Sequence, residues 1–350
     1  MQEFSLSTKI CYGKDALQAL QPWYGQPALL VTDPFFEQNG TAAGILAHFS
    51  PESRLFSPAG GEPTVALAAR GAELLQQTAP RVLLALGGGS AIDCAKGMLA
   101  ASGFGPELIA IPTTSGTGSE VTSFAVLSHN GIKKVLLDEK LRPKLAILDE
   151  GFLGALPASL VADAGMDALC HALEAAVAKK ATPLTTALAI SAADTLLRLL
   201  PASFRGDLSV RGEVHLAACM AGIAFDYAGL GACHALSHAL GGHFHLPHGR
   251  LNAVLLPAVL EYNLAQCATL YAAPAKKLGF STGRSLVYGL KHLCRELKLP
   301  GTLRAAGIPR EELLHSLKEL CQAALADPCT AHNPRVPTQE DYAGILRKCS

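Results

Sequence analysis

The first part of the chain alternates short apolar runs with stretches that have the periodicity of helices. The apolar runs cover residues 28–32, 81–86, 108–112 and 145–148. This alternation is typical of a parallel sheet whose strands are connected by helices. Between Thr122 and Leu137, two β-rich runs flank His129-Asn130-Gly131, and Asn-Gly is a strong hairpin signal. The pattern therefore predicts an α/β domain that contains a β-hairpin.

Beyond Pro157 the pattern changes to long stretches rich in alanine and leucine. They cover residues 161–179, 183–200, 210–225 and 284–298, and clusters of β-branched residues almost disappear. Long segments of this kind are typical of packed helices. We therefore predict an α/β domain over residues 1–158 and an all-helical domain over residues 159–350, with the active site in the cleft between them.

Composition narrows the class of protein. A chain of 350 residues with 49% hydrophobic and 17% charged residues has the material for two well-buried domains. Its 29 basic and 29 acidic residues balance, so no long-range field favours nucleic acid or an anionic membrane. Ten scattered cysteines, no long apolar span and no basic, apolar leader at the start together predict a cytoplasmic protein with free thiols.

A glycine-rich turn follows the apolar run 81–86. Gly87-Gly88-Gly89-Ser90 precedes a helical pattern that contains Asp93. Glycines let a backbone approach a pyrophosphate, and the start of a helix favours the charge of a phosphate. The same residues also fit a tight turn with Ser90 as N-cap and Asp93 as its capping-box partner. The glycines alone favour neither interpretation.

Two further features belong to the same half of the chain. The loop from Pro112 to Glu120 is rich in hydroxyls and glycines, but neither loop has the G-x-G-x-x-G spacing of the standard dinucleotide motif. Asp33 follows the run 28–32, where a carboxylate can accept from ribose hydroxyls and repel a 2′-phosphate. A plain turn residue before Pro34 is the simpler interpretation of Asp33.

Histidines gather in one segment of the second half. Five of the 12 histidines lie between residues 234 and 248. In a helix, His234 and His238 share one face because they are four residues apart, and the same holds for Asp167 and His171. His248 follows in Pro247-His248-Gly249, which we interpret as a loop that folds back.

One carboxylate with several imidazoles suits Zn(II) or Fe(II) in an open, catalytic site. Any one of these histidines alone would more often be a structural residue, but the combined spacing is hard to explain that way. We interpret His243 and His245 as polar loop residues or donors to ligands. Cys170 and Cys233 adjoin the proposed ligands in sequence and are expected to point away from them as packing residues.

Together these motifs resemble the iron-containing (group III) alcohol dehydrogenases over nearly the whole chain, from about residue 4 to residue 350. The matching motifs are Gly87-Gly88-Gly89-Ser90 with Asp93 and Lys96, Pro112-Thr113-Thr114 with Gly116-Thr117 and Glu120, Gly165-x-Asp167-Ala168-x-x-His171-Ala172-x-Glu174, Gly229-Leu230-Gly231-x-x-His234-x-x-x-His238, Pro247-His248-Gly249 with Asn252-Ala253, and Asn333-Pro334-Arg335. Within the family, the opening Glu3-Phe4-Ser5-Leu6-Ser7-Thr8 and the run from Gly241 to Gly249 look most like the 1-propanol dehydrogenases of propanediol-utilisation microcompartments.

The resemblance implies roles for individual residues. The metal ligands would be Asp167, His171, His234 and His248, and His238 would be a catalytic group near the nicotinamide. The cofactor contacts would be Asp33, Gly87, Gly88, Gly89, Ser90, Asp93, Thr113, Thr114, Thr122 and Lys134. By position, Phe124 and Phe225 would line the substrate pocket.

The implied activity is the reversible, NADH-linked reduction of small, propanal-like aldehydes with Fe(II), or alternatively Zn(II), as Lewis acid. The alternatives are a polyol, lactaldehyde or glycerol-type dehydrogenase, a phosphate-eliminating synthase on a related fold, and an inactive binding component of a microcompartment. Relatives are commonly dimers or larger. The resemblance therefore implies a homo-oligomer, with microcompartment shell or enzyme proteins as possible partners.

Overall fold

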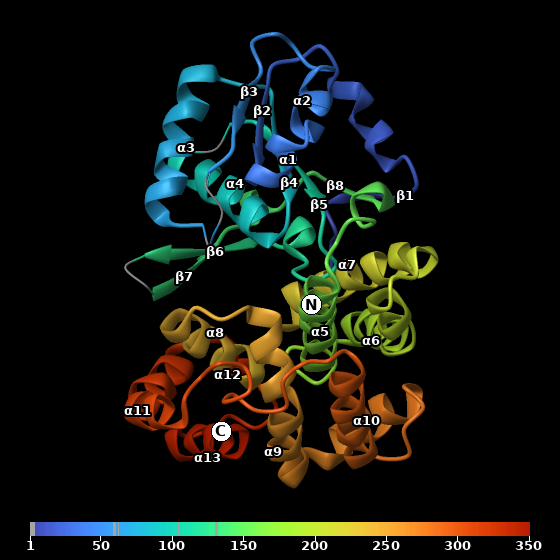
Figure 1. The fold of residues 1–350 in the computed structure, drawn as a ribbon, viewed down its shortest axis with the longest axis vertical. Helices are drawn as coiled ribbons and strands as arrows, with labels where there is room; N and C mark the ends of the chain where they lie inside the picture. Colours follow the sequence, from blue (N-terminus) through green and yellow to red (C-terminus); the bar gives the residue numbers. More distant parts are fainter. Residues whose placement is uncertain (1–3, 59–60, 62, 104, 130–131) are drawn as a thin grey trace. The chain divides into compact units, whose positions relative to one another are not determined.

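The computed structural model describes residues 4–350 except 59–60, 62, 104 and 130–131 (Figure 1). The chain divides into two compact units, Met1–Leu156 and Pro157–Ser350. The first unit is α/β and the second is all-helical, so the predicted fold class is confirmed. The predicted hairpin turn at Asn130-Gly131 falls outside the described residues.

The first unit contains a six-stranded, all-parallel sheet. Its strand order is β1 (Lys9–Gly13), β8 (Leu145–Asp149), β5 (Glu107–Pro112), β4 (Val82–Gly87), β2 (Ala28–Thr32) and β3 (Arg54–Phe56). Every residue of β2, β4 and β8 is buried, as expected for strands covered on both faces. The apolar runs had predicted β2, β4, β5 and β8, but not the two partly exposed edge strands β1 and β3.

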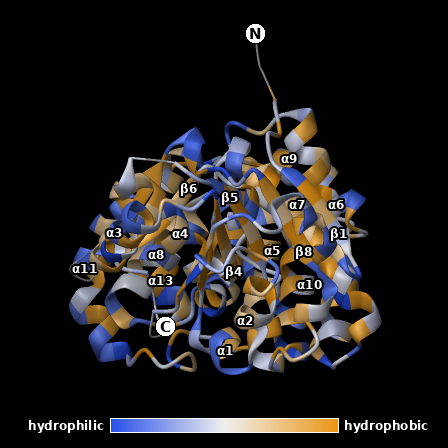
Figure 2. Cartoon of the chain, turned by 90° about the horizontal axis from the view of Figure 1, so that it is seen from above, coloured by the Kyte–Doolittle hydropathy of each residue, from blue (hydrophilic) through white to orange (hydrophobic). Residues whose placement is uncertain are grey.

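Helices cover both faces of this sheet. On one face, α3 (Val65–Thr78) and α4 (Gly89–Ser102) pack Leu75, Ile92 and Met98 against the strands. On the other face lie η1 (Ala16–Trp23), α1 (Pro34–Gln38) and α2 (Thr41–Leu46), which contribute residues such as Leu20 and Ile45. Figure 2 colours the strands between these layers as hydrophobic. The turns at the carboxyl ends of β2, β4 and β5 carry most of the predicted cofactor residues.

The antiparallel hairpin of β6 (Phe124–His129) and β7 (Ile132–Leu137) stands apart from the main sheet. Its register pairs Phe124 with Leu137, which brings the two ends of the hairpin together. β6 packs against α3 and α4. The start of β6 is therefore fixed to the helix that begins at the glycine-rich turn.

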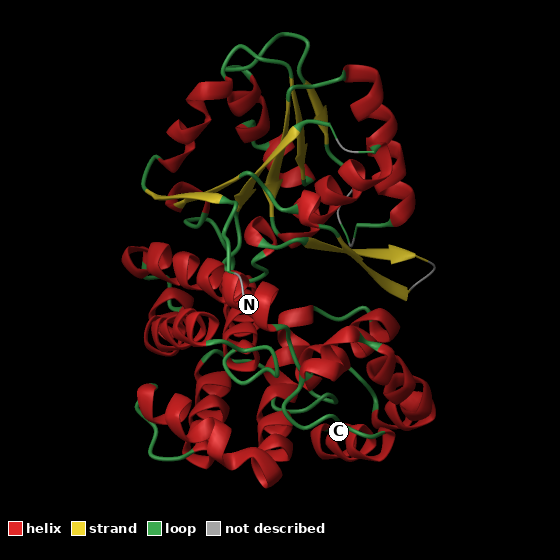
Figure 3. Ribbon diagram, turned by 180° about the vertical axis from the view of Figure 1, so that it is seen from behind, coloured by secondary structure: helices red, strands yellow, loops and turns green. Residues whose placement is uncertain are grey.

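The second unit contains no strand in residues 157–350, all of which are described (Figure 3). Its helices are α5 (Ala158–Ala175), α6 (Pro183–Phe204), α7 (Arg211–Ala228), α8 (Ala232–Phe244), α9 (His248–Lys277), α10 (Gly283–Glu296), α11 (Arg310–Ala326), α12 (Pro328–His332) and α13 (Gln339–Cys349). The predicted helical stretches correspond to α5, α6, α7 and α10 with shifted ends. Buried α5 packs against α6, α7 and α9.

Three helical segments, Pro183–Phe204, Leu208–Ala228 and His248–Lys277, are long and apolar enough to cross a membrane by length and composition alone. In this fold α6 packs against α5 and α7, while α9 packs against α5, α8 and α10. Their apolar residues thus contribute to the interior of the helical unit. The absence of a membrane partner stays a prediction.

Candidate metal centre and nucleotide-binding region

Helix α5 presents Asp167 and His171 on one face. They are four residues apart, and Asp167 Oδ1 lies 3.8 Å from His171 Nε2. The helix can pack this closely because small residues face its neighbours. A Cβ atom added to Gly165 would lie 2.2 Å from a methyl carbon of Leu200 on α6. The glycine therefore permits the approach of α6 that buries this part of α5.

The start of α8 is held by side chains from distant segments. The carboxylate of Glu174 accepts hydrogen bonds from the backbone N–H groups of Gly231 at 2.9 Å and Cys233 at 2.8 Å. Asn333 Oδ1 accepts from the backbone N–H group of Ala232, at 3.1 Å. A Cβ atom on Gly231 would lie 2.7 Å from oxygens of both Glu174 and Asn333, so only glycine fits. These contacts cap the helix and position His234 in its first turn.

His248 is the first residue of α9, so its interpretation as a loop residue is wrong. The helix begins here because Pro247 occupies the N-cap and cannot extend it backwards. A Cβ atom on Gly249 would lie 1.9 Å from the backbone oxygen of Asp163. Glycine is thus required where the first turn of α9 meets α5, close to Asp167.

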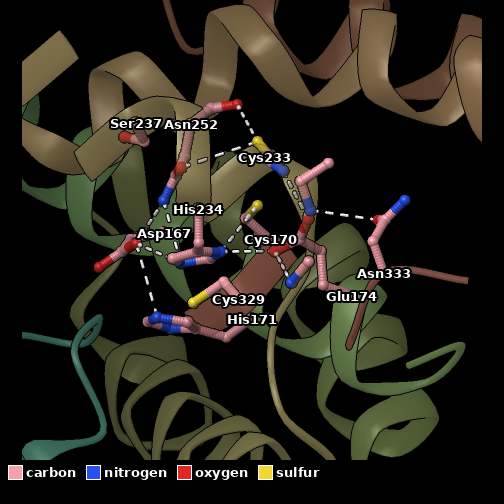
Figure 4. A network of polar contacts seen from close by, with 12 residues as sticks. Asp167, Cys170, His171, Glu174, Cys233, His234, Ser237, Asn252, Cys329 and Asn333 are labelled. Atoms are coloured by element: carbon pink, nitrogen blue, oxygen red, sulfur yellow. Dashed lines mark hydrogen bonds and ion pairs between the residues drawn. The ribbon is translucent and has the colours of Figure 1, made fainter. Parts of the chain in front are cut away.

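The four predicted metal ligands meet at one carboxylate oxygen. Asp167 Oδ1 lies 3.6 Å from His234 Nε2 and 3.8 Å from His171 Nε2 (Figure 4). The same oxygen lies 3.5 Å from His248 Nε2. Ligand atoms of Asp167, His234 and His248 all lie within 4.8 Å of one another, and His171 joins them through Asp167. The amide nitrogen of Asn252 lies 2.8 Å from Asp167 Oδ1 and 3.2 Å from the Nε2 atoms of His234 and His248.

The other ring nitrogen of each of three histidines has its own partner. Nδ1 of His234 lies 2.6 Å from Glu174 Oε2, and Nδ1 of His248 lies 3.0 Å from Ser237 Oγ. His238, outside the ligand group, has its Nδ1 2.8 Å from Asp327 Oδ2. Such partners fix the orientation of a ring and hence where its Nε2 atom points.

Sequence reasoning missed Glu174, Ser237, Asn252 and Asp327 as functional residues. A signal existed for Glu174 and Asn252. Glu174 lies seven residues after Asp167 and Asn252 lies four residues after His248, so each shares a helix face with a ligand. Asp327 belongs to a distant segment and gave no such signal.

Cys170 and Cys233 do not point away from the site, which corrects their interpretation as packing residues only. Cys170 Sγ on α5 lies 3.7 Å from His234 Nδ1 on α8. Cys233 Sγ lies 3.7 Å from Asn252 Oδ1 on α9. Each cysteine thus contacts a residue of another helix in the group around the proposed ligands.

Aromatic contacts surround the same group. Phe225 on α7 is stacked on His171, with ring centroids 4.3 Å apart. His238 is stacked on His248 at 5.1 Å with an interplanar angle of 14°. His243 lies inside α8 rather than in a loop, and its Nε2 atom lies 3.0 Å from Ser316 Oγ. His245 is the C-cap of α8.

In the first unit, the glycine-rich turn leads directly into α4. Gly87 has φ of +151°, which favours glycine, and Gly88 is the N-cap with no side-chain cap. Ser90 and Asp93 therefore do not form the capping box considered above. Asp93 instead accepts from Ser119 Oγ at 2.5 Å and from the N–H of Val126 at 3.0 Å.

Buried Lys96 organises the segment that leads into β6. Its ammonium group donates to Thr122 O at 2.9 Å, to Thr122 Oγ1 at 3.1 Å and to Phe124 O at 2.8 Å. Burial raises the pKa of neighbouring Asp93, and the charge of Lys96 opposes that rise. Thr122 and Asp93, both predicted cofactor contacts, thus make internal hydrogen bonds.

The remaining predicted cofactor residues lie on separate segments. Asp33 caps α1 by accepting from the N–H of Phe35 at 3.0 Å. Thr113 is buried and its N–H donates to Gly87 O, while Thr114 is half-buried. Lys134 is exposed on β7.

Comparison with known proteins covers both units. Residues 7–150 match the iron-containing alcohol dehydrogenase model, and residues 161–350 match the C-terminal model of the Fe-containing alcohol dehydrogenase family. The chain belongs to the iron-containing alcohol dehydrogenase family. It is 36% identical to the 1-propanol dehydrogenase PduQ of Salmonella typhimurium, over 99% of this chain and 100% of the relative. It is also 36% identical to an NADPH-dependent butanol dehydrogenase of Clostridium saccharobutylicum, over 99% and 97% of the two chains. An iron-containing alcohol dehydrogenase of Thermococcus thioreducens superposes with a TM-score of 0.92 at 32% identity, with 99% of both chains covered.

The predicted family is therefore confirmed, and the chain is an oxidoreductase of the alcohol dehydrogenase type. Membership implies a nicotinamide cofactor and a metal ion.

The electrostatics of the histidine group fit a cation. Burial raises the pKa of Asp167, but the charges of His171 and His248 and the hydrogen bond of His234 outweigh this and lower it.

The buried carboxylates also change the pKa of His234. Burial lowers its pKa, but Asp167 and Glu174, on opposite ring nitrogens, raise it to about 10. Two buried carboxylates thus hold a proton on the imidazole. A divalent ion can supply that positive charge in place of the proton, because metal binding requires the deprotonated ligand. The donor set of one carboxylate and three imidazoles fits iron or zinc.

The glycine-rich turn fits a phosphate-bearing cofactor less specifically. A Cβ atom on Gly89 would lie 2.9 Å from Thr117 Oγ1, so packing between the two loops already requires a glycine there. The absence of a side-chain cap at the start of α4 leaves the positive end of the helix to other partners. This is the one feature of the turn that favours an anion.

Proposed function

We propose that this alcohol dehydrogenase is a metal-dependent, NAD(H)-linked reductase of small aldehydes, and that it oxidises primary alcohols in reverse. The observation that carries the proposal is the approach of three imidazole nitrogens to Asp167 Oδ1, within 3.8 Å. Asp167, His171, His234 and His248 would hold the ion, with Fe(II) preferred and Zn(II) as the alternative. When bound, the ion supplies Lewis acidity that stabilises negative charge on the substrate oxygen.

The surrounding side chains prepare the ligands for this role. Glu174 and Ser237 orient the rings of His234 and His248 through their Nδ1 atoms. This orientation directs both Nε2 atoms toward Asp167 before any ion arrives. Removing the acceptors would leave the rings free to rotate, so the residues beside the ligands contribute to affinity.

His238 would exchange a proton with the substrate oxygen. Its Nδ1 atom is occupied by Asp327, which leaves Nε2 as the atom that carries the exchanged proton. Histidine suits such a role because its unperturbed pKa lies near neutrality. Its position one helical turn after His234 supports a place beside the ligands rather than among them.

The nucleotide would bind at the loops that follow β2, β4 and β5. The start of α4 with residues Gly87 to Ser90 would receive the pyrophosphate, which is favoured by the exposed positive end of the helix. Thr113 and Thr114 come from the next loop, while Asp93 and Thr122 both bond to Ser119 at the end of that loop. Lys134 is proposed as a further contact from β7. NADH, when bound, supplies the hydride.

Asp33 supports a preference for NAD(H). One of its oxygens caps α1 and the other lies toward Gly87, 3.4 Å from the position of an added Cβ atom. A carboxylate at this turn would repel a 2′-phosphate. The relative from Clostridium saccharobutylicum is named for NADPH, so both cofactors belong in the test.

Small unbranched aldehydes are the proposed substrates. By position, Phe124 and Phe225 would line the substrate pocket, and an apolar wall gives a substrate hydroxyl no hydrogen bond. Propanal should therefore exceed lactaldehyde in kcat/KM. We further propose a homodimeric or larger, cytoplasmic enzyme. The likeness to the 1-propanol dehydrogenase PduQ supports the proposal that it works with shell or enzyme partners in a propanediol-utilisation microcompartment.

One experiment tests the activity. The purified chain is reconstituted with Fe(II) or with Zn(II), and NADH and NADPH oxidation is followed with propanal, butanal, lactaldehyde and dihydroxyacetone. We expect the Fe(II) form with NADH and propanal to be fastest. A preference for lactaldehyde or dihydroxyacetone would replace this proposal with a polyol dehydrogenase, and inactivity with all four would leave a binding component.

A further inference from the structure

A carboxylate from far along the chain serves both His238 and a helix terminus. Asp327 Oδ2 lies 2.8 Å from His238 Nδ1. Asp327 Oδ1 accepts the N–H of Cys329, also at 2.8 Å, and thereby caps α12. The side chains of His238 and Asp327 are only 17% and 12% exposed, so water competes little for this hydrogen bond.

The direction of the hydrogen bond follows from the chemistry of its partners. Burial raises the pKa of Asp327, but the hydrogen bond and charge of His238 outweigh this and lower it to about 2. Asp327 is therefore ionised at neutral pH and can only accept. The donor must be the Nδ1–H group of His238, which leaves Nε2 as the nitrogen whose proton can be exchanged.

We propose that Asp327 is a positioning residue for the reaction, which fixes the tautomer and the ring orientation of His238. The inference rests on the proposed role of His238 in proton exchange. In the direction of aldehyde reduction, the Nε2–H bond of the imidazolium breaks and an O–H bond to the product oxygen forms. The ring is left neutral with its proton on Nδ1, and solvent returns the proton to Nε2. Asp327 accepts from the Nδ1–H group and stays ionised throughout.

The structure offers a simpler role, in which Asp327 only caps α12. Asp327→Asn separates the two roles. The amide oxygen of asparagine can still accept the N–H of Cys329, so the cap is kept. The amide NH2 group then faces His238 Nδ1 and reverses the direction of the hydrogen bond, which drives the neutral ring to the wrong tautomer.

The test is a double-mutant cycle on the metal-loaded enzyme with propanal and NADH. It compares the parent, Asp327→Asn, His238→Ala and the double variant. Asp207→Asn is the matched control, because Asp207 caps η5 (Leu208–Val210) through Ser209 N–H at 3.0 Å. We expect Asp327→Asn to lower kcat by about 10- to 100-fold, while KM changes less than about threefold. Metal content and the Kd for NADH should stay at parent values.

In the His238→Ala background, Asp327→Asn should lower kcat no further, because its effect passes through the imidazole. In the zinc-loaded protein, imidazole ¹⁵N shifts should show the proton of the neutral ring on Nδ1 in the parent and on Nε2 in Asp327→Asn. Asp207→Asn should leave all these quantities unchanged.

Two failures have different meanings. An equal loss of kcat from Asp327→Asn in both backgrounds, or a loss of metal, would show that Asp327 acts through the fold, and the inference would be overturned while the role of His238 stands. If His238→Ala itself keeps the parent kcat, the proposed proton exchange is wrong, and the role of Asp327 falls with it.

Discussion

The metal-binding and nucleotide-binding regions differ in how their residues meet. In the helical unit, side chains from α5, α8 and α9 converge on one oxygen of Asp167. In the α/β unit, the predicted contacts are spread over several turns, and some of them, such as Asp93 and Thr122, are engaged in internal hydrogen bonds. The metal-binding region carries negative charge that a cation can balance. The nucleotide-binding region offers mainly backbone groups at the start of α4.

The difference reflects what each ligand requires. An ion needs several lone pairs at one point, so its protein ligands must approach one another even when it is absent. A dinucleotide is bound along its length by loops and helix ends, and few of its contacts touch each other. Contacts among side chains therefore identify the metal residues more sharply than the nucleotide residues.

The largest expected effect tests the convergence directly. His234→Ala removes a ligand flanked by two buried carboxylates, Asp167 and Glu174. We expect loss of bound metal and a fall in kcat of more than about 1000-fold, or roughly 4 kcal/mol. Elemental analysis and steady-state kinetics measure both quantities.

His243→Ala is the control, because His243 lies on the same helix but contacts Ser316 outside the ligand group. His238→Ala should slow turnover and keep the metal. If His234→Ala retains full metal while His238→Ala loses it, the two roles are reversed.

The next effect concerns the stability of the first unit. Lys96→Met removes a buried ammonium group. The oxygens of Thr122 and Phe124 then lose their hydrogen-bond donor, and Asp93 loses a nearby positive charge. Breaking one side of a buried charged network typically costs about 3–5 kcal/mol. We expect a marked drop in Tm by calorimetry and weaker NADH binding. The exposed Lys14, changed to Met, should leave both unchanged. A normal Tm would mean that Lys96 does not hold this segment.

A smaller effect tests the support of the metal ligands. The carboxylate of Glu174 accepts hydrogen bonds from His234, Gly231 and Cys233. Glu174→Gln keeps the size of this side chain but removes its negative charge. Changes to such partners typically lower metal affinity or activity by about 10- to 100-fold. Competition with a chelator measures the affinity. Glu213→Gln on the exposed side of α7 serves as control, and equal affinities for the two variants would contradict the proposal.

The smallest effect tests the nucleotide region. Asp33→Asn removes the charge and keeps an oxygen that can cap α1. We expect kcat/KM with NADPH to rise about tenfold relative to NADH, because a like-charge repulsion is removed. A parent enzyme that already uses both cofactors equally would contradict the role of Asp33.

Much of this molecule was predictable because its patterns are local. Strands buried on both faces produce continuous apolar runs, whereas the three residues of edge strand β3 do not. Pairs such as Asp167 and His171 were visible because a helix places them on one face. By contrast, the bond between Asp327 and His238 depends on how α8 packs against α12, which no local pattern encodes.

Errors in the prediction of the site had the same origin. The spacing of Asp93 from Ser90 fitted a capping box. Its carboxylate instead accepts hydrogen bonds from Ser119 and Val126, which lie outside the helix. Cys170 was expected to point away from the ligands, but its sulfur lies 3.7 Å from His234 Nδ1 of α8. The sequence spacing predicts which side chains share a face of a helix. Which residues that face contacts depends on how the helices pack.

The order of the ligands along the chain bears on how a cell would load the metal. During synthesis Asp167 and His171 emerge first, and His248 follows only with the first turn of α9. Until that turn docks at Gly249, beside Asp163, the nascent site lacks one ligand and the amide of Asn252. Early fragments would thus exchange ions freely, and firm retention would begin only when α9 is in place.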